Sequence, residues 1–349
     1  MNKFLIISTV VSLAFLSPCS DEEWHKQTQI AEQLPITLGT SVGYDTRSNT
    51  ATNLISGDTV WVWTDMINGA TQAVGVYFKA WALKANGVGG LATLQAGNTK
   101  LFPATNVLNF YALVGNFGKV TEGERIGEPM IDAENDPLPT TGIRHTVLND
   151  QTTPEAYYKS DLLYAVVKNQ EPVSAAVVLP FKHLLSRVQV VLVAGNGVTA
   201  SELNSATVKL LNLKRQIAFN PDKGADFSSQ SDLAGMLTWS NLFSSGDILM
   251  STNTVGSVSE ATAENSTVYA DAIVVPQTIE KGANFIQVSY LGHDTYYRIP
   301  NGTNDEPLTL ESGKQYRFRL IADRVGESYE MTISIADWDI QTGSSMWAE

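Results

Sequence analysis

Apolar and polar residues alternate with a period of two along most of the chain beyond residue 33. This alternation is typical of β-strands that bury one face, because successive side chains of a strand point to opposite sides. We therefore expect an all-β fold. The expected strands are residues 34–43, 58–65, 73–83, 107–114, 162–168, 175–195, 206–220, 268–277, 285–300, 315–323 and 329–340.

The stretch "QYRFRLIAD" shows the alternation most clearly. Tyr316, Phe318 and Leu320 share one face, and Arg317 and Arg319 share the other. This pattern predicts an antiparallel strand that is buried on one side only.

Two local features predict where strands turn or stop. The glycine of "LGHD" (291–294) can adopt a positive φ, so the two runs around it predict a hairpin. Pro180 lies inside an apolar run and lacks a backbone N–H, so it should interrupt that strand or lie at a sheet edge.

Helical patterns are sparse, and only "PFKHLL" and "TASELNS" could form a turn or two of helix. The polar stretches 118–160 and 221–265 show no period and predict surface loops. The two groups of strands predict two antiparallel β-sandwich domains in tandem, residues 34–170 and 171–349, joined near "NQEPVSA".

Composition narrows the classes of function. The chain has 349 residues, with 23 basic against 36 acidic residues and a net charge of −13. This excess of acid argues against nucleic-acid binding, because there is no basic surface to neutralise phosphates. Hydrophobic content of 43% and charged content of 17% are those of a well-packed globular protein.

The N-terminus predicts export as a lipoprotein. Lys3 precedes a short apolar run, residues 4–16, which matches the core of a signal peptide. "LSPC" then resembles a lipobox, so residues 1–18 are the expected signal peptide and Cys19 the expected site of lipidation. Two or more acyl chains there would anchor the protein stably in a membrane. The alternative is that the chain's single cysteine is incidental.

The residues after the cysteine continue this prediction. "SDEE" resembles the acidic tag that directs Bacteroidales lipoproteins to the outer face of the outer membrane. Residues 19–33 are polar without a clear period and predict an acidic tether. No later apolar stretch is long enough to cross a bilayer as a helix.

No set of residues predicts catalysis, a metal site or a cofactor site. The histidines His25, His145, His183 and His293 lack the spacing of a zinc site. Nucleophile and phosphate-loop motifs are absent, and the oxygen-rich loops lack the ligand pattern of a calcium site. We therefore expect a protein that is not an enzyme and that needs no cofactor.

The tryptophans could form a platform for sugars, but their positions favour packing. Trp61, Trp63, Trp81 and Trp338 all lie within expected strands. Buried aromatic side chains dominate the packing of such cores. We expect core packing for these residues.

Several phrases in a fixed order resemble the fimbrillins, the subunits of type V pili in Bacteroidales. The most specific phrase, "VVLPFKHLLSRVQVVL" (177–192), is similar to the F-x-H-x-x-S-[RK]-[VL] phrase that opens the second domain in this family. The resemblance spans nearly the whole chain after the signal peptide. It implies transthyretin-like β-sandwich domains and a role in adhesive surface fibres. The other matching phrases are "ISGDTVWVW", "TKLFPATNVLNFYALV", "SDLLYAVV", "SGKQYRFRL" and "ISIADWD".

The resemblance also implies a way of assembling. An arginine-specific protease would cut the lipid-anchored precursor at Arg47, the only basic residue between Lys26 and Lys79, in a polar stretch where proteolysis is easy. The cut would release the strand that carries Ile36, Leu38 and Val42. A strand of a neighbouring subunit would then fill the apolar groove.

In the family the incoming strand is commonly C-terminal, which points to Met331, Ile333 and Ile335 as its inserting side chains. The tail "QTGSS" is short and polar, so the chain could also cap or anchor a fibre. The alternative is that Arg47 is an ordinary surface arginine.

The leading hypothesis is a pilus subunit or pilus-associated lipoprotein of the cell outer membrane. Its partners would be other pilin subunits, the membrane through the lipid, and a host or bacterial surface ligand. The alternative is a surface lipoprotein that binds glycan and does not polymerise. A surface hydrolase is the third hypothesis, and no convergent acid, base or metal set supports it.

Overall fold

The computed structural model describes residues 34–42, 54, 57–86, 91–93, 99–118, 138, 142–194, 197–203, 205–224, 234–238, 244–252, 267–299, 307–322 and 331–337. All of them belong to one compact unit, residues 33–349. The expected signal peptide, the acidic tether, Cys19 and Arg47 lie outside the described residues.

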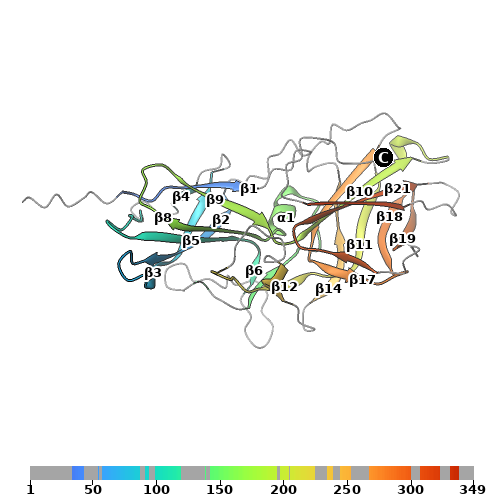
Figure 1. Cartoon of the computed structure of the whole chain (residues 1–349). Coiled ribbons are helices and arrows are strands. Elements are labelled where there is room, and N and C mark those ends of the chain that lie inside the picture. Colours follow the sequence, from blue (N-terminus) through green and yellow to red (C-terminus); the bar gives the residue numbers. More distant parts are fainter. Residues whose placement is uncertain are drawn as a thin grey trace, which may run out of the picture. The chain divides into compact units, whose positions relative to one another are not determined.

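The largest sheet has seven strands in the order β1-β9-β8-β5-β2-β3-β4 (Figure 1). Each of the strands expected between residues 34 and 168 is present in it. Its strands are β1 Leu38–Val42, β2 Thr59–Ile67, β3 Val74–Ala85, β4 Leu91–Thr93, β5 Val107–Val114, β8 Leu163–Gln170 and β9 Val177–His183.

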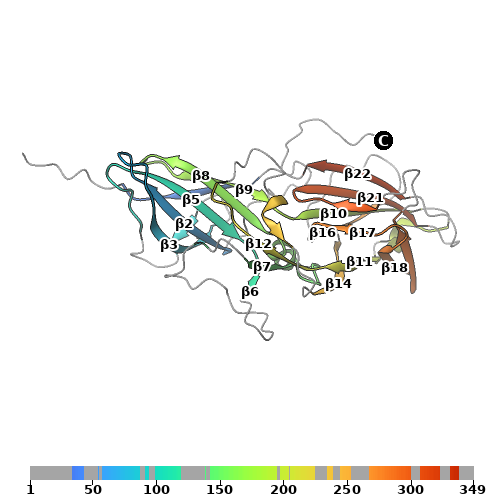
Figure 2. The same ribbon diagram turned by 60° about the horizontal axis from the view of Figure 1, so that its bottom comes forward.

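Two further sheets face each other, with the orders β15-β16-β10-β21-β22 and β14-β11-β18-β19. Phe285 and Phe318 meet between them with ring centroids 5.3 Å apart, and the Tyr297 hydroxyl donates to the Ile321 carbonyl (3.1 Å). Figure 2 shows β21 between β10 and β22. The strands are β10 Ser186–Ala194, β11 Thr207–Lys214, β14 Ser245–Leu249, β15 Ser251–Thr252, β16 Thr267–Val274, β18 Asn284–Tyr290, β19 His293–Arg298, β21 Lys314–Ala322 and β22 Met331–Asp337.

Two small sheets and two short helices complete the described fold. One small sheet, in the order β13-β12-β7-β6, joins strands from both halves of the sequence, and the other pairs β17 with β20. Their bounds are β6 Phe117–Gly118, β7 Ile143–Thr146, β12 Gln216–Phe219, β13 Leu237–Thr238, β17 Gln277–Ile279 and β20 Leu308–Leu310. The helices are α1 Pro154–Lys159 and α2 Ala200–Leu203. The expected all-β class is confirmed.

The apolar residues bury as the alternation predicts. Tyr316, Phe318 and Leu320 are buried, whereas Arg319 is exposed. Trp63 and Trp81 are each 2% exposed and lie in the hydrophobic core, so their expected packing role is confirmed.

The hairpin predicted around "LGHD" is confirmed, because β18 and β19 pair antiparallel across Leu291 and Gly292. Pro180 does not interrupt its strand, contrary to the first of the two expectations, because β9 continues through it and pairs it with Ser41 of β1. On the other side, the ladder from β9 to β8 contains only the pairs at His183 and Lys182. The ladder to β8 thus ends short of the proline, which has no N–H to offer it.

The sheets differ from the expectation of antiparallel sandwiches at two places. β1 pairs parallel with β9, and β10 pairs parallel with β21. Alternation of side chains is the same in both kinds of pair, so it could not have distinguished them. The expected helical turn in "PFKHLL" is wrong, because residues 180–183 belong to β9 and the two leucines that follow are not helical, whereas α2 lies in "TASELNS".

Two expected surface loops contain buried structure. The stretch 118–160 holds β7 and α1, and Ile143, His145 and Val147 are fully buried there. The stretch 221–265 holds β14, whose Ile248 is also fully buried. Both segments were missed because their strands are too short to show a period.

The expected division of the chain at residues 170 and 171 stays a prediction. β9 follows that point in the sequence and still extends the seven-stranded sheet. β12 comes from the second half and pairs with β7 from the first half.

Candidate functional site

The first described segment of the chain is hydrogen-bonded along one side to residues 100–102. The Ile36 amide donates to the Lys100 carbonyl (2.8 Å), and the Phe102 amide donates to the Leu34 carbonyl (2.8 Å). Paired bonds of this kind are those of a short antiparallel ladder. The residues that precede β1 therefore have a fixed partner.

The same segment is bonded to β9 further along. The Val177 amide donates to the Thr37 carbonyl (2.9 Å), and residues 38–42 then pair with residues 177–181 in parallel register. Residues 34–42 thus fill a slot between two other segments of the chain. We call these residues the first strand.

Side chains of the first strand alternate between the core and solvent. Ile36 and Leu38 are 3% and 4% exposed, whereas Pro35 and Thr37 are exposed. The two buried side chains join a hydrophobic cluster that also contains Val60, Val62, Phe78, Trp81, Phe102, Phe110, Leu163, Val177, Leu179 and Phe181. The first strand is therefore an integral part of this core.

Aromatic rings form part of the core around the slot. Phe102, in the segment that bonds the first strand, lies edge-on to Phe110 with centroids 6.3 Å apart. Phe78 contacts Phe110 and Trp81 in similar tilted arrangements, at 6.5 and 5.4 Å. A slot with such surroundings holds an apolar strand by burial and by backbone hydrogen bonds.

The structure places only some of the predicted site residues. Ile36 and Leu38 come together in the core, as described above. Val42 pairs with Phe181 through its backbone, and its side chain lies outside the described part of the structure. Cys19 and Arg47 also lie outside it, so lipidation and cleavage stay predictions.

The predicted donor residues lie in a different sheet from the slot. Met331, Ile333 and Ile335 belong to β22, which pairs antiparallel with β21 over residues 331–337. β22 is the edge strand of its five-stranded sheet (Figure 2). The structure does not bring these residues together with Ile36 and Leu38.

Two of the phrases that carry the family resemblance contact each other. His183, from "FKHLLSRV", and Asp161, from "SDLLYAVV", are both buried, and His183 Nδ1 lies 2.6 Å from Asp161 Oδ2. The Ser186 hydroxyl, three residues on, donates to the Glu311 carbonyl (2.6 Å). The polar residues of these phrases therefore fix the passage from β9 to β10.

His145 is a second buried histidine close to this passage. The Asn116 amide donates to its Nδ1 (3.1 Å), so Nε2 carries the proton and donates to the Ser160 carbonyl (2.9 Å). Burial lowers the pKa of His145 to about 4. The imidazole is therefore neutral at neutral pH, and it serves as a structural hydrogen-bond bridge.

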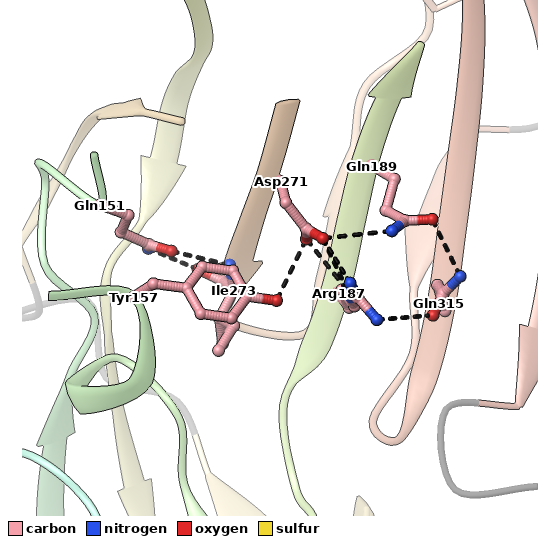
Figure 3. A network of polar contacts seen from close by, with 7 residues as sticks. All are labelled: Gln151, Tyr157, Arg187, Gln189, Asp271, Ile273 and Gln315. Carbon is pink, nitrogen blue, oxygen red and sulfur yellow. Dashed lines mark hydrogen bonds and ion pairs between the residues drawn. The ribbon is translucent and has the colours of Figure 1, made fainter. Parts of the chain in front are cut away.

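A buried network of charged and amide side chains crosses the five-stranded sheet (Figure 3). Arg187 Nε donates to both carboxylate oxygens of Asp271 (3.0 Å each), and the Tyr157 hydroxyl from α1 donates to the same carboxylate (3.1 Å). Gln189 Nε2 donates to Asp271 (3.1 Å), and Gln315 Nε2 donates to Gln189 (3.0 Å). All five side chains are buried, which such a group tolerates only when it is fully hydrogen-bonded.

Gln151 closes the network on the side of α1. Its amide exchanges two hydrogen bonds of 2.8 Å with the backbone of Ile273, in the manner of a neighbouring strand. Sequence reasoning missed this whole group. The available signal was the pair Arg187 and Gln189 at alternate positions of an otherwise apolar run, which places two polar side chains on one face of a buried strand.

One ion pair ties the second half of the sequence to the seven-stranded sheet. Lys223 Nζ lies 2.7 Å from Asp65 Oδ2, and it also lies 5.1 Å from the centre of the Tyr111 ring. Burial, with a contribution from the Asp65 carboxylate, raises the pKa of Tyr111 to about 12. The phenol therefore stays protonated, and the arrangement holds the turn at residues 221–224 against β2.

The described residues hold no group of three or more His, Cys, Asp or Glu side chains placed to bind a metal ion. Among the same residues, no helix has the length and apolar character to cross a membrane.

Comparison with known proteins gives one family and one fold. The family model described as fimbrillin-like matches residues 46–338. A candidate cell adhesion protein from Bacteroides uniformis has a similar structure, with a TM-score of 0.54 and 17% identity over 87% of this chain and 98% of that one. A candidate cell adhesion protein from Bacteroides ovatus has a TM-score of 0.59 and 15% identity, over 89% and 99% of the two chains. No curated protein matches this sequence.

Proposed function

Because the chain belongs to the fimbrillin-like family, we propose that it is a subunit of a surface pilus, or a protein associated with one, that assembles by strand exchange. Members of this family are structural and adhesive proteins rather than enzymes. In our proposal the precursor is exported, lipidated at Cys19 and held at the outer membrane. Cleavage at Arg47 then frees the first strand, and a strand of another subunit replaces it.

The observation that carries the proposal is the way in which the first strand is held. The first strand comes at the start of the described chain. Its backbone pairs with residues 100–102 and with β9, and its buried side chains belong to the core. Once the backbone is cut after such a strand, the strand is no longer covalently joined to the rest of the domain and can dissociate from it. The proposed cut at Arg47 lies five residues beyond Val42.

Loss of the first strand would leave backbone groups without partners and apolar side chains exposed, which favours the binding of another strand. The Phe102 and Val177 amides and the Lys100 carbonyl would lose their partners. A buried backbone group without a hydrogen-bond partner costs about 1–3 kcal/mol. The apolar surface that Ile36 and Leu38 had covered would also become exposed to water, which is unfavourable. A strand of the right pattern from a second chain satisfies both needs.

The C-terminal strand carries such a pattern. The first strand reads "LPITLG" from residue 34, and β22 reads "MTISIA" from residue 331. Both have bulky apolar residues at the first, third and fifth positions and a small residue at the sixth. Met331, Ile333 and Ile335 would then stand where Leu34, Ile36 and Leu38 stand.

Donation by β22 requires that it first leaves β21, its partner within the same chain. An edge strand can do so while the rest of its sheet stays paired, because only one ladder is lost. A chain in which β22 stays in place would accept a strand without donating one, and it would then cap or anchor a fibre.

The proposal includes two transthyretin-like sandwich domains in tandem, residues 34–170 and 171–349. The separate hydrophobic cluster around the first strand, which draws on residues 36–181, supports a distinct N-terminal unit. The second cluster supports a C-terminal unit around β10, β11, β18 and β21.

Incubation of the purified precursor with an arginine-specific protease tests the proposal. We expect a ladder of polymers on a gel and a new N-terminus at Ser48. Arg47→Ala should abolish both, whereas Arg125→Ala, in another polar stretch of the sequence, should leave both intact. Polymerisation of Arg47→Ala at the parent rate would show that the cleavage mechanism is wrong.

A further inference from the structure

The outer face of the β18–β19 hairpin presents an aromatic ring to solvent. Tyr296 on β19 is 44% exposed, whereas the next residue, Tyr297, is 2% exposed and packs in the core. Among the side chains that the structure describes, Tyr296 is the most exposed large aromatic group. An exposed phenol ring on a regular strand has a fixed backbone and few rotamers to lose on binding.

Polar side chains flank this ring on both sides along the same face. Asp294 and Arg298 lie two residues before and two residues after Tyr296, so all three share one side of β19. Gln287 on β18 stands directly opposite Tyr296, and Lys209 on β11 stands opposite Gln287. The row thus crosses three strands.

Hydrogen bonds hold these polar groups in place before any ligand arrives. The Ser289 hydroxyl donates to Asp294 Oδ1 (2.6 Å), and Arg298 Nε donates to Asn284 Oδ1 (2.8 Å). The hydrogen bonds from Ser289 and Gln287 lower the pKa of Asp294, so its carboxylate stays charged. Ordered polar groups lose less entropy on binding than free ones.

We propose that this face, formed by Tyr296, Asp294, Arg298, Gln287 and Lys209, binds a saccharide chain. An exposed aromatic ring offers its face to the apolar C–H side of a sugar ring, and fixed carboxylate, guanidinium and amide groups can bond the hydroxyls at its rim. The mixture of two cations and one anion suits a polar ligand with many hydroxyls. It does not suit an apolar peptide or a nucleic acid, in a chain whose net charge is −13.

This inference supplies a ligand class for the proposed adhesive role, and it does not depend on strand exchange. The uncut chain carries the whole face. Failure of polymerisation and failure of binding are therefore separate results.

Binding of the uncut chain to a microarray of neutral and acidic oligosaccharides tests the inference, followed by titration of the brightest oligosaccharide. We expect Tyr296→Ala to weaken binding at least about tenfold, a size that follows from the loss of one aromatic contact. Tyr296→Phe should retain binding, because it keeps the ring. The exposed position of Tyr296 makes both variants compatible with the native fold.

Two exposed apolar residues provide matched controls. Leu291→Asn alters the tip of the same hairpin, and Val178→Ala alters β9 in a different sheet, and both should bind like the parent. Absence of binding to every oligosaccharide would overturn the inference. Equal loss in Tyr296→Ala and in either control would overturn it too, because binding would then not involve this face.

Discussion

Arg187 and Asp271 form a buried ion pair across neighbouring strands β10 and β16. Arg187 Nε lies 3.0 Å from each carboxylate oxygen, and both residues are at most 5% exposed. Asp271 stands opposite Gln189 in the ladder, so the pair runs diagonally and draws both strands and α1 into one network. The arginine of the most specific family phrase thus has a structural role inside the protein.

Removal of one member of this pair should destabilise the protein strongly. We expect Asp271→Ala to lower the free energy of unfolding by about 3–5 kcal/mol, because it leaves a buried guanidinium without its charge partner. Urea unfolding measures the loss. The double variant Arg187→Met/Asp271→Leu should lose clearly less than the sum of its single variants. Simple additivity would show that the two charges do not interact.

Truncation of a buried side chain of the first strand should lower the free energy of unfolding. Ile36→Ala removes a side chain that is 3% exposed, and a buried cavity of this kind costs about 2–5 kcal/mol. Urea unfolding of the uncut chain measures it. Thr37→Ala, at the neighbouring exposed position, should stay within about 0.5 kcal/mol of the parent. Equal effects of the two changes would contradict the alternation seen in the structure.

His145 should make the protein less stable in acid. Its pKa is about 4 in the folded state and 6.5 when exposed, so the unfolded chain binds the extra proton between these values. Stability from this group is therefore complete above pH 6.5 and is lost as pH falls towards 4. The shift corresponds to about 3 kcal/mol, and the advantage of the parent over His145→Gln should shrink by that amount between pH 7 and pH 4. Parallel stability curves for the two proteins would refute this role.

The hairpin turn at Leu291 should be open to stabilisation. Leu291 has φ of 52° and Gly292 has φ of 78°, as a two-residue turn of this type requires. A leucine is strained in that region, whereas asparagine tolerates it. Leu291→Asn should raise the free energy of unfolding by about 0.5–1 kcal/mol in thermal or urea unfolding. Leu291→Ala lacks the polar side chain by which asparagine tolerates this region, so a gain of the same size there would point to another cause.

The longer strands of this fold were predictable from their apolar residues. The apolar run at Val107–Val114 predicted β5, which is buried on both faces, and alternation assigned Tyr316, Phe318 and Leu320 of β21 to the core. Short elements were not predictable in this way. α1 has six residues, and a local signal for it was Thr153 before Pro154. The structure shows that Thr153 caps the helix by accepting a hydrogen bond from the Ala156 amide.

Which strands pair with each other could not be predicted from the sequence. Nothing in residues 34–43 indicates that they pair in parallel with β9. The alternation of side chains in a strand does not depend on which strand it pairs with or in which direction. The network around Arg187 was hidden for the same reason. Its members come from β10, β16, β21 and α1, and only the fold brings them together.

The fate of the first strand tests the central claim most directly. Trypsin releases residues 27–47, which contain this strand, and residues 188–209, which contain most of β10, as separate peptides. Mass spectrometry of the uncut chain should find both peptides in equal amounts. Purified polymer should contain 188–209 and lack 27–47, because a strand of another subunit has replaced the first strand. Recovery of the two peptides in equal amounts from the polymer would contradict the account.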